Sequence, residues 1–434
     1  MSIFGALSTA VSGINAQSSA FSNISDNVAN SQTTGFKRID TNFVDYLTTS
    51  TQAANDSGSV VARPEYQNEV QGTITQSDNP LAMAISGQGF FQVSQETGVT
   101  QNGATLSNRV EYSRNGDFKL DNSGYLVNGS GQVLNGWSVD PATGVTNQNK
   151  AAPIKISQSS FSPIATSSVT LAANLPATPA SATPMSPSVD VYDAKGTLHT
   201  VSLNFTRNGN DDWTVSVNSP DATTPALGSA ELKFGAASGN AVAAGTIGSV
   251  TNPSGSVTAG AFSANGNATL GFTADFGGGP QAVSLNLGTF GGASGVTQFA
   301  GTAYTLRGLT QNGVPPGAFK NVTAQSSGAI VVNYDNGQSR TVAQVPLISF
   351  ANADQLQRQD GQAFTATTGS GVALAQDASN AGSGHLVTSS VESSNVDIAA
   401  EFTKLIVAQR AYSANTKLVT TAEDLLTQTI DMKR

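Results

Sequence analysis

Histidine is the side chain most often used for metal binding and acid–base chemistry, and this 434-residue chain has two, His199 and His385. They are far apart, and neither has a second ligand-type residue at metal-site spacing. Asp211 and Asp212 form a carboxylate pair, but they lack the ordered spacing of a calcium loop and fall where a hairpin turn is expected. We therefore expect no metal site, and we assign these residues to strands, turns and the surface.

Two short matches to cofactor motifs are equally weak. Gly87 and Gly89 form half of a dinucleotide-binding fingerprint, yet Phe90 and Phe91 follow where a helix should open. The triplet 275–277 matches a kinase motif without its companions. Cysteine is absent, which excludes a thiolate nucleophile and a disulfide. No nucleophile, base and orienting acid can be assembled, so we expect no catalytic residue, no cofactor and no enzyme activity.

The composition predicts a polar but weakly charged surface. Only 11% of residues are Asp, Glu, Lys or Arg, about half of the usual share. Such a surface opposes packing against identical copies very little, because few charges repel or must be desolvated. With a net charge of −9 and scattered basic residues, the chain offers no cationic stripe for a phosphate backbone, and we expect no nucleic acid binding. With no basic residue before Lys37 and no long apolar run, we expect neither a cleavable signal peptide nor membrane insertion.

The first secondary-structure element that the sequence predicts is an amino-terminal helix. Apolar residues recur there every seven positions, with one between the last two: Leu7, Ile14, Phe21, Ile24 and Val28. The pattern predicts a helix from about residue 2 to about residue 33, stopped by Gly35. Its other face is Ser, Thr, Asn and Gln, which are mediocre helix formers. We expect this segment to be poorly ordered in the free monomer and helical once packed.

A matching stripe lies at the carboxyl end. Its apolar residues are Ile398, Phe402, Leu405, Tyr412, Val419 and Leu426. The segment 394–397 has the form of a capping box, and Lys433 and Arg434 lie where cations favour a helix C-terminus. We expect one helix from about residue 396 to the end.

The two stripes allow three arrangements. They could pair inside one monomer as an ordinary antiparallel bundle, or the first could lie on a membrane surface, although such helices carry Lys and Arg. The weakly charged outer faces favour the third arrangement, in which the stripes are buried between neighbouring copies. We therefore predict that the stripe residues pack in the core of a polymer.

Between the stripes the pattern is that of short antiparallel strands. Eight Asn-Gly pairs, a strong signal for tight hairpin turns, lie between Asn102 and Gly337. Apolar residues alternate around several of them. The Gly-, Ala-, Ser- and Thr-rich region from about 225 to 300 alternates too, so we expect β-structure with long loops there.

These patterns predict a multidomain α+β protein. Long N- and C-terminal helices are expected to form a paired, coiled-coil-like inner domain, and mainly β outer domains, antiparallel and barrel- or sandwich-like, are expected to be nested by insertion. The predicted segments are 1–33 and 394–434 for the helical inner domain, 34–70 for a connection, 71–150 and 320–393 for a discontinuous β domain, and 151–319 for an inserted outer β domain.

The residues beside the helices resemble those of a known family. At the amino end, the N-terminal motif of bacterial flagellar rod and hook proteins is matched by Asn27, Asn30, Thr33, Gly35, Phe36 and Lys37. At the carboxyl end, the partner motif is matched by Asn395, Asp397, Gln409, Arg410 and Asn415. The segment 81–93 is similar to a shared family segment, although Ala82 stands where an acidic residue is common. The segment 191–205 resembles the corresponding segment of hook proteins rather than that of rod proteins.

The resemblance implies a structural subunit of the flagellar hook that self-assembles into a curved, flexible tube, the universal joint between rod and filament. It implies an extracellular location in the hook of the basal body, reached through the flagellar type III export apparatus. The implied partners are other copies of the chain in a helical homopolymer, the distal rod protein, the hook cap protein and the hook–filament junction proteins. By analogy, a loop from about 34 to 70 would connect the helices to the β domains.

Two alternatives stay open. A distal rod-type protein of the flagellar basal body would share the end motifs but form a straight tube. A secreted β-rich adhesin would explain the middle of the chain but not the paired stripes.

Overall fold

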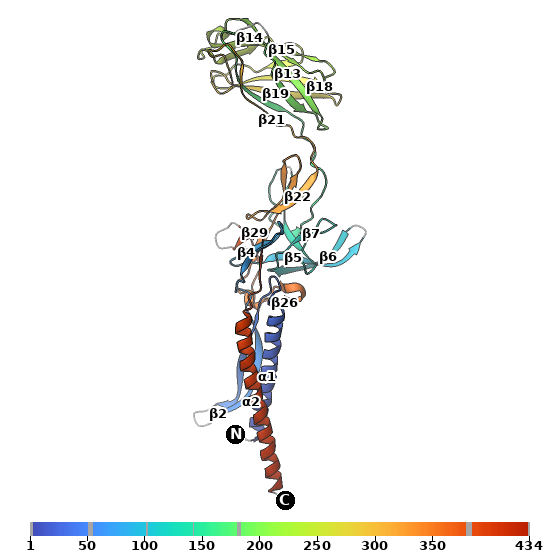
Figure 1. Cartoon of the computed structure of the whole chain (residues 1–434), viewed down its shortest axis with the longest axis vertical. Helices are drawn as coiled ribbons and strands as arrows, with labels where there is room; N and C mark the ends of the chain where they lie inside the picture. The colour runs from blue at the N-terminus through green and yellow to red at the C-terminus, as the bar shows by residue number, and fades with distance from the viewer. Residues whose placement is uncertain are drawn as a thin grey trace. The chain divides into compact units, whose positions relative to one another are not determined.

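The computed structural model describes residues 3–50, 55–100, 103–141, 143–179, 184–378 and 384–432. Two helices lie at the ends of the chain, and the middle is mostly β-strand (Figure 1). This confirms the prediction of a mainly β protein with two terminal helices. The chain forms two compact units. Unit 1 comprises Met1–Gln158, Lys320–Asn333 and Ser339–Arg434, and unit 2 comprises Ser159–Phe319 and Tyr334–Gln338.

The two helices of unit 1 lie close to where they were predicted. Helix α1 spans Ile3–Ala29 and helix α2 spans Ile398–Asp431. Helix α1 ends before the predicted residue 33, and the chain passes through turns to Gly35, whose φ of 71° lies in the left-handed region. Gly35 therefore closes the turns after the helix rather than the helix itself.

Asp397 caps the start of α2. Its carboxylate accepts hydrogen bonds from the N–H groups of Ala399 and Ala400, which satisfies two donors that have no partner within the helix. The predicted capping box is wrong, because Ser394 is not the cap and its hydroxyl accepts from the N–H of Val396. Lys433 and Arg434 lie outside the described residues.

Helices α1 and α2 pack side by side and run antiparallel (Figure 1). Phe21 of α1 meets Tyr412 of α2 edge to face, with 6.3 Å between ring centroids. Further along, Asn27 of α1 bonds Glu401 of α2. Pairing inside one chain, one of the arrangements that the sequence left open, is therefore present.

Strands β1 (Ile39–Ser50) and β2 (Asn55–Tyr66) form a long antiparallel hairpin. It packs against α1, where the Ser12 hydroxyl accepts from the N–H of Val60 and Asn23 donates to the Thr41 hydroxyl. The expectation of a loop from 34 to 70 is wrong for these residues. The strands pair the backbone groups that face each other, and the N–H of Val60 finds its partner on α1.

The remaining strands of unit 1 come from both sides of unit 2 in the sequence. The early strands are β3 (Ile74–Gln76), β4 (Met83–Ser86), β5 (Phe91–Thr100), β6 (Gly103–Ser113), β7 (Lys119–Leu120), β8 (Leu126–Val127), β9 (Gln132–Ser138) and β10 (Ala152–Pro153). The late strands are β22 (Phe319–Ala324), β23 (Ala329–Tyr334), β24 (Ser339–Gln344), β25 (Pro346–Ser349), β26 (Gln357–Gln359), β27 (Ala363–Thr365), β28 (Leu374–Asp377), β29 (His385–Thr388) and β30 (Ser390–Glu392). Short 3-10 helices lie at Ala353–Gln355 and Asp360–Gln362.

The main sheet of unit 1 mixes these two groups. Its order is β22-β23-β24-β9-β5-β6-β27-β26, while β4 pairs with β29 and β3 pairs with β30. Strand β30 leads into α2, and β3 follows the hairpin that packs on α1. The sheets of unit 1 therefore anchor both ends of the chain at one place.

Unit 2 consists of two sheets. Its strands are β11 (Ser168–Asn174), β12 (Ser188–Tyr192), β13 (Leu198–Gly209), β14 (Asp212–Asn218), β15 (Ala226–Phe234), β16 (Ile247–Thr251), β17 (Val257–Ala259), β18 (Asn267–Asp275), β19 (Pro280–Thr289), β20 (Val296–Thr297) and β21 (Thr305–Gln311), with a 3-10 turn at Gly235–Ser238. One sheet has the order β12-β13-β14-β15-β16, and the other β17-β18-β19-β11-β20 with β21 also on β11. The strands predicted between 225 and 300 are confirmed.

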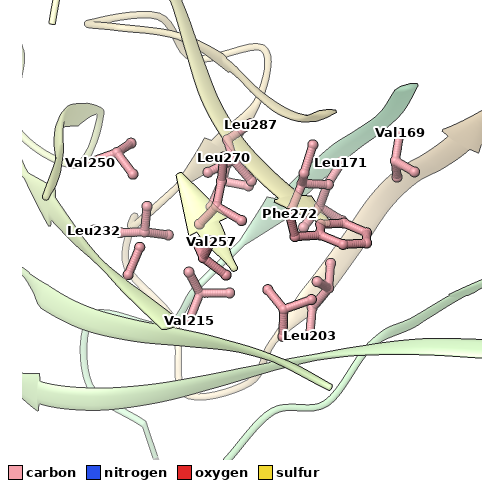
Figure 2. Packing of buried hydrophobic residues seen from close by; sticks show 14 of the residues in the cluster. Val169, Leu171, Leu203, Val215, Leu232, Val250, Val257, Leu270, Phe272 and Leu287 are labelled. Atoms are coloured by element: carbon pink, nitrogen blue, oxygen red, sulfur yellow. The ribbon is translucent and has the colours of Figure 1, made fainter. Parts of the chain in front are cut away.

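Alternating side chains of both sheets form one apolar cluster in unit 2. Figure 2 shows Leu203, Val215 and Leu232 from one sheet near Leu270 and Phe272 from the other. These residues are buried, and the period-two alternation places every second residue in the cluster. The core of unit 2 therefore follows directly from the strand pattern.

The chain enters and leaves unit 2 through adjacent segments. Phe161 faces Gly317 in an antiparallel bridge, and Ile164 faces Val314 in the next. Each pair exchanges two backbone hydrogen bonds. The two ends of the inserted segment are thus held together by backbone pairing.

The weak chemical motifs lie in turns. Asp211 has a φ of 61° in the β13–β14 turn. Gly87 and Gly89 have φ values of 96° and 133° in the turn between β4 and β5. The carboxylate of Asp275 accepts from the N–H groups of Gly277 and Gly279 after β18. The turn assignment is confirmed for Asp211 and for the two glycines, and the triplet 275–277 also lies at a turn.

Candidate assembly interface

The seam between the end helices is lined by small residues of α1. The buried residues on this face are Ala10, Gly13, Ala16, Ala20, Ile24 and Asn27. They recur every three or four positions, which places them on one side of the helix. A Cβ atom on Gly13 would lie 2.9 Å from the side-chain nitrogen of Asn415, so the two helices approach closely at this point.

Because small residues occupy the seam, most of the predicted stripe residues of α1 lie beside the seam rather than in it. Only Ile24 of that stripe is buried, while Leu7, Ile14, Phe21 and Val28 are half-buried. Sequence periodicity found the apolar residues but not the Ala and Gly positions of closest contact, because a seven-residue count is dominated by large side chains.

The stripe of α2 is divided in the same way. Leu405, Val419 and Leu426 are half-buried. Ile398, Phe402 and Tyr412 are exposed. Further large apolar side chains of α2 are exposed as well: Ile406, Val407, Leu418, Leu425, Ile430 and Met432.

These exposed side chains fall on two sides of α2. One side, which we call flank A, comprises Ile398, Phe402 and Ile406, spaced four residues apart. The other, flank B, comprises Val407, Leu418 and Leu425, spaced eleven and seven residues apart. At about 100° per residue the two sets point in different directions, on either side of the seam. Periodicity alone did not identify Ile406 or Val407, because both lie off the heptad.

The family-like polar residues lie mainly at the joint between the helices and the sheets. Asn27 is fully buried and donates to the Ile39 carbonyl at 2.8 Å and to Glu401 at 3.1 Å, while it accepts from the Ile39 N–H at 2.9 Å. The carboxylate of Glu401 also accepts from Lys404 at 2.8 Å. Asn27 thus joins α1, β1 and α2 through one amide.

Asn395 makes a similar set of bonds just before α2. Its amide oxygen accepts from the N–H of Arg38 at 2.7 Å. Its amide nitrogen donates to the carbonyls of Gln67 and Val70 at 3.1 and 3.0 Å. Because these partners lie on both sides of the β1–β2 hairpin in sequence, Asn395 fixes the base of the hairpin to the start of α2.

Three charged side chains form a buried ion network at the same joint. Lys37 donates to Glu392 at 2.6 Å, and Arg114 donates to the other oxygen of Glu392 at 3.1 Å. All three side chains are at most 1% exposed. Burial lowers the pKa of the Lys37 amine to about 8, against the opposing pull of Glu392. The network connects the segment between α1 and β1, strand β30 and the turn after β6.

Sequence analysis identified Lys37 but not its two partners. Glu392 is the last acidic residue before the C-terminal motif, and Arg114 stands directly before an Asn-Gly turn. The available signal for both residues was a single charged side chain next to a predicted strand, which indicates a buried ion pair when it is not at the surface.

The remaining motif residues shape the chain after α1. A Cβ atom on Gly35 would lie 2.6 Å from the backbone nitrogen of Asn115, so only glycine fits there. The ring of Phe36 is buried beneath the guanidinium of Arg358, 4.4 Å from the ring centroid. Asn30 accepts from the Thr33 hydroxyl at 3.2 Å. These contacts turn the chain from α1 toward the hairpin.

Gln409 and Arg410 are not part of the joint. Both lie exposed on α2, whereas Asn415 is half-buried against Gly13. The structure therefore separates the C-terminal motif into joint residues, a seam residue and two exposed residues.

The histidines do not meet. His199 lies on β13 and His385 on β29. Across the described residues, no group of three or more His, Asp or Glu side chains could hold a metal ion. Neither helix, over its described length, is both long and apolar enough to cross a membrane.

Four family models match successive parts of the chain. Residues 7–37 match "Flagella basal body rod protein", residues 84–171 match "Flagellar hook protein FlgE/F/G D1 domain", residues 164–314 match "Flagellar basal body protein FlaE D2 domain", and residues 387–432 match "Flagellar basal body rod FlgEFG protein C-terminal". None of these descriptions refers to catalysis.

Relatives match over the full length. The chain is 31% identical to the flagellar hook protein FlgE of Brucella abortus biovar 1 (strain 9-941) over 439 residues, which covers 100% of both chains. It is 32% identical to the flagellar hook protein FlgE of Salmonella typhimurium over 445 residues, covering 98% of this chain and 99% of the relative. The crystal structure of Helicobacter pylori flagellar hook protein FlgE2 aligns with 72% of this chain and 98% of its own, at 13% identity and a TM-score of 0.47, which is too distant to carry an argument.

Proposed function

Because the chain belongs to the flagellar hook protein family and is a structural subunit of the hook, we propose that it polymerises through its two end helices. The product is a curved, flexible tube in the hook of the basal body. It acts as the universal joint between rod and filament during motility. The polymer is a helical assembly of identical subunits, each contacting several others.

The observation that carries this proposal is the presence of flanks A and B on one helix. A monomer rarely exposes so many large apolar side chains without a partner for them. A helical polymer requires unlike surfaces that meet in heterologous contacts, since a single self-complementary patch would stop at a dimer. Two apolar flanks in different directions supply such surfaces.

The proposed core residues combine the seam and the flanks. The half-buried stripe residues of α1 and α2 and the exposed residues of flanks A and B together form a coiled-coil-like inner domain when copies assemble. Together with buried Ile24 and exposed Tyr412, this set contains every predicted packing residue: Leu7, Ile14, Phe21, Ile24, Val28, Ile398, Phe402, Leu405, Tyr412, Val419 and Leu426. Apolar burial of this kind contributes about 1.5 to 3 kcal/mol for each large side chain that becomes fully buried.

The outer parts of the chain have a different proposed role. Residues 71–150 and 320–393 form a discontinuous β domain, and 151–319 form a sandwich-like outer domain nested within it. Their polar, weakly charged surfaces can exchange contacts with one another and with water at little net cost. Such surfaces suit contacts that must change as the tube bends, while the apolar core stays closed.

The specific partners follow from membership of the family. We propose that the chain passes through the flagellar type III export apparatus and adds beneath the hook cap protein. The first subunits contact the distal rod protein, and the last contact the hook–filament junction proteins.

Seeded polymerisation tests the proposal. Purified chain is added to short polymer fragments, and growth is followed by light scattering and electron microscopy. Curved tubes are expected from the full chain, and none from a chain lacking residues 1–33. Straight tubes would favour a rod-type protein, and growth without residues 1–33 would contradict assembly through the end helices.

A further inference from the structure

His199 lies at a meeting point of three turns in unit 2. It is on β13, with 9% of the residue exposed. Its ring stacks on Phe276, with 4.1 Å between centroids and an angle of 6° between the planes. Phe276 belongs to the turn between β18 and β19, so the stack joins the two sheets of unit 2 at one end.

Two carboxylates face opposite nitrogens of this ring. The Nε2 atom lies 3.6 Å from Asp193, and the Nδ1 atom lies 3.6 Å from Asp221. Asp193 is in the turn between β12 and β13, and Asp221 is in the loop between β14 and β15. Neither ring nitrogen makes a hydrogen bond in the described structure, since 3.6 Å exceeds the length of such a bond.

Both carboxylates are held where they are by the backbone. Asp193 accepts from the N–H groups of Thr197 and Lys195 at 2.7 and 2.9 Å. Burial alone would raise the pKa of the Asp193 carboxyl, but these N–H groups and the neighbouring His199 ring hold that pKa below its ordinary value. Asp221 accepts from the N–H of Thr200 at 3.3 Å. A negative charge therefore faces each nitrogen.

The charge of the ring decides whether both contacts are favourable. A neutral imidazole has one N–H and one lone pair, so one carboxylate must face a lone pair. A protonated ring donates from both nitrogens, and each donor then has a carboxylate partner. Because the carboxylates lie on opposite sides of the ring, they cannot share a single metal ion with it.

The adjoining turns also carry Lys195, Asp275 and Phe276. Lys195 contributes its backbone N–H to Asp193. On the third turn, the carboxylate of Asp275 is bonded to the N–H groups of Gly277 and Gly279. Phe276 presents only its aromatic face to the ring.

We infer that His199 is a proton-dependent clasp, whose protonation draws Asp193 and Asp221 onto the ring and stabilises the adjoining turns of unit 2 in a mildly acidic medium. Stability from this source is present at low pH and is lost as the pH rises and the ring loses its proton.

The chain itself supplies the matched control, because it has only two histidines. Full-length His199→Gln and His385→Gln are compared with the wild-type chain at pH 5.5 and 7.5, as dilute monomers. Hydrogen exchange of residues 193–200 and 219–223, corrected for intrinsic rates, reports the stability of the turns. Protection should rise about tenfold at pH 5.5 in the wild-type chain and in His385→Gln, the gain expected from two charge-assisted bonds of which one is half exposed.

His199→Gln should lose this rise. An equal rise in His199→Gln, or its loss in His385→Gln, would overturn the inference. Should His199→Gln fail to fold, NMR of the two imidazoles in the wild-type chain decides the question. Both ring nitrogens of His199 must then carry N–H protons that are protected from exchange with water at pH 5.5, and unprotected N–H protons on both nitrogens would refute the clasp.

Discussion

Replacing Leu418 of flank B by Gln should impair assembly without impairing the fold. Leu418 is 59% exposed in the subunit, so the change removes little packing from the monomer. Leu and Gln have similar helix propensities, so α2 should persist. If assembly buries the exposed part of this side chain, the lost stabilisation is about 1 to 2 kcal/mol, roughly half or more of the value for a fully buried leucine.

A loss of this size is measurable as a critical concentration. At about 1.4 kcal/mol per tenfold change, the critical concentration for seeded growth should rise about 5- to 30-fold. It is measured as the monomer left in solution when growth stops. Lys417→Gln introduces the same side chain at the neighbouring exposed position and should change this concentration less than about twofold.

Flank A gives an independent check. Ile406 is 51% exposed, and Ile406→Gln should raise the critical concentration by a similar factor. Because flanks A and B point in different directions, the double variant should multiply the two factors. If Leu418→Gln grew at the wild-type critical concentration while circular dichroism showed an intact α2, flank B would not be buried on assembly and the reasoning would be refuted.

Three further predictions concern the joint between helices and sheets. Glu392→Gln leaves Lys37 and Arg114 buried without their carboxylate and should lower the free energy of unfolding of unit 1 by about 3 to 5 kcal/mol in urea titrations. The pKa of Lys37 is about 8 in the folded chain and 10.5 for a free lysine. Between these pH values the unfolded chain therefore keeps a proton on this amine that the folded chain has lost. The free energy of unfolding should rise with pH across that window, by about 3 kcal/mol at most, relative to Lys37→Met. Gly35→Ala should lower the free energy of unfolding by more than about 2 kcal/mol, because φ is 71° and a backbone atom lies 2.6 Å from the new Cβ. Gly337→Ala should lower it by about 1 kcal/mol in the same thermal or urea assay, because φ is 79° but the new Cβ meets open space.

Each of these has an outcome that contradicts it. A loss below about 1 kcal/mol for Glu392→Gln would mean that water reaches the ion network. A stability difference between wild type and Lys37→Met that does not change from pH 8 to 10.5 would show that the amine titrates alike in both states. Equal costs for the two glycine variants would remove the argument from close backbone approach.

The fold was predictable where periodicity is strong. The alternation at Leu270 and Phe272, and the heptads at both ends, identified strands and helices because burial on one face dictates the period. The β1–β2 hairpin was missed because its segment has no Asn-Gly turn. The buried seam of α1 was missed because Ala and Gly carry little hydrophobic signal, although they allow the closest helix contact.

The candidate site was predictable only in part. Motif residues such as Asn27 and Lys37 were identified by resemblance, but their bonds depend on residues hundreds of positions away, such as Glu392 and Glu401. Pairing across such distances leaves no periodic trace in one sequence. Likewise, His199 was expected on a strand or at the surface and lies buried on β13. Its two carboxylate neighbours come from separate turns that only the folded chain brings together.

The paired segments where the chain enters and leaves unit 2 have a practical consequence. Phe161 and Gly317 face each other across an antiparallel bridge, with Cα atoms about 5.5 Å apart, as in other hydrogen-bonded antiparallel pairs. A foreign domain whose own termini are similarly close could be grafted between them in place of the present segment. Each copy in a tube would then display one such domain at regular intervals, which makes this chain an acceptor for ordered, repetitive presentation of enzymes or antigens.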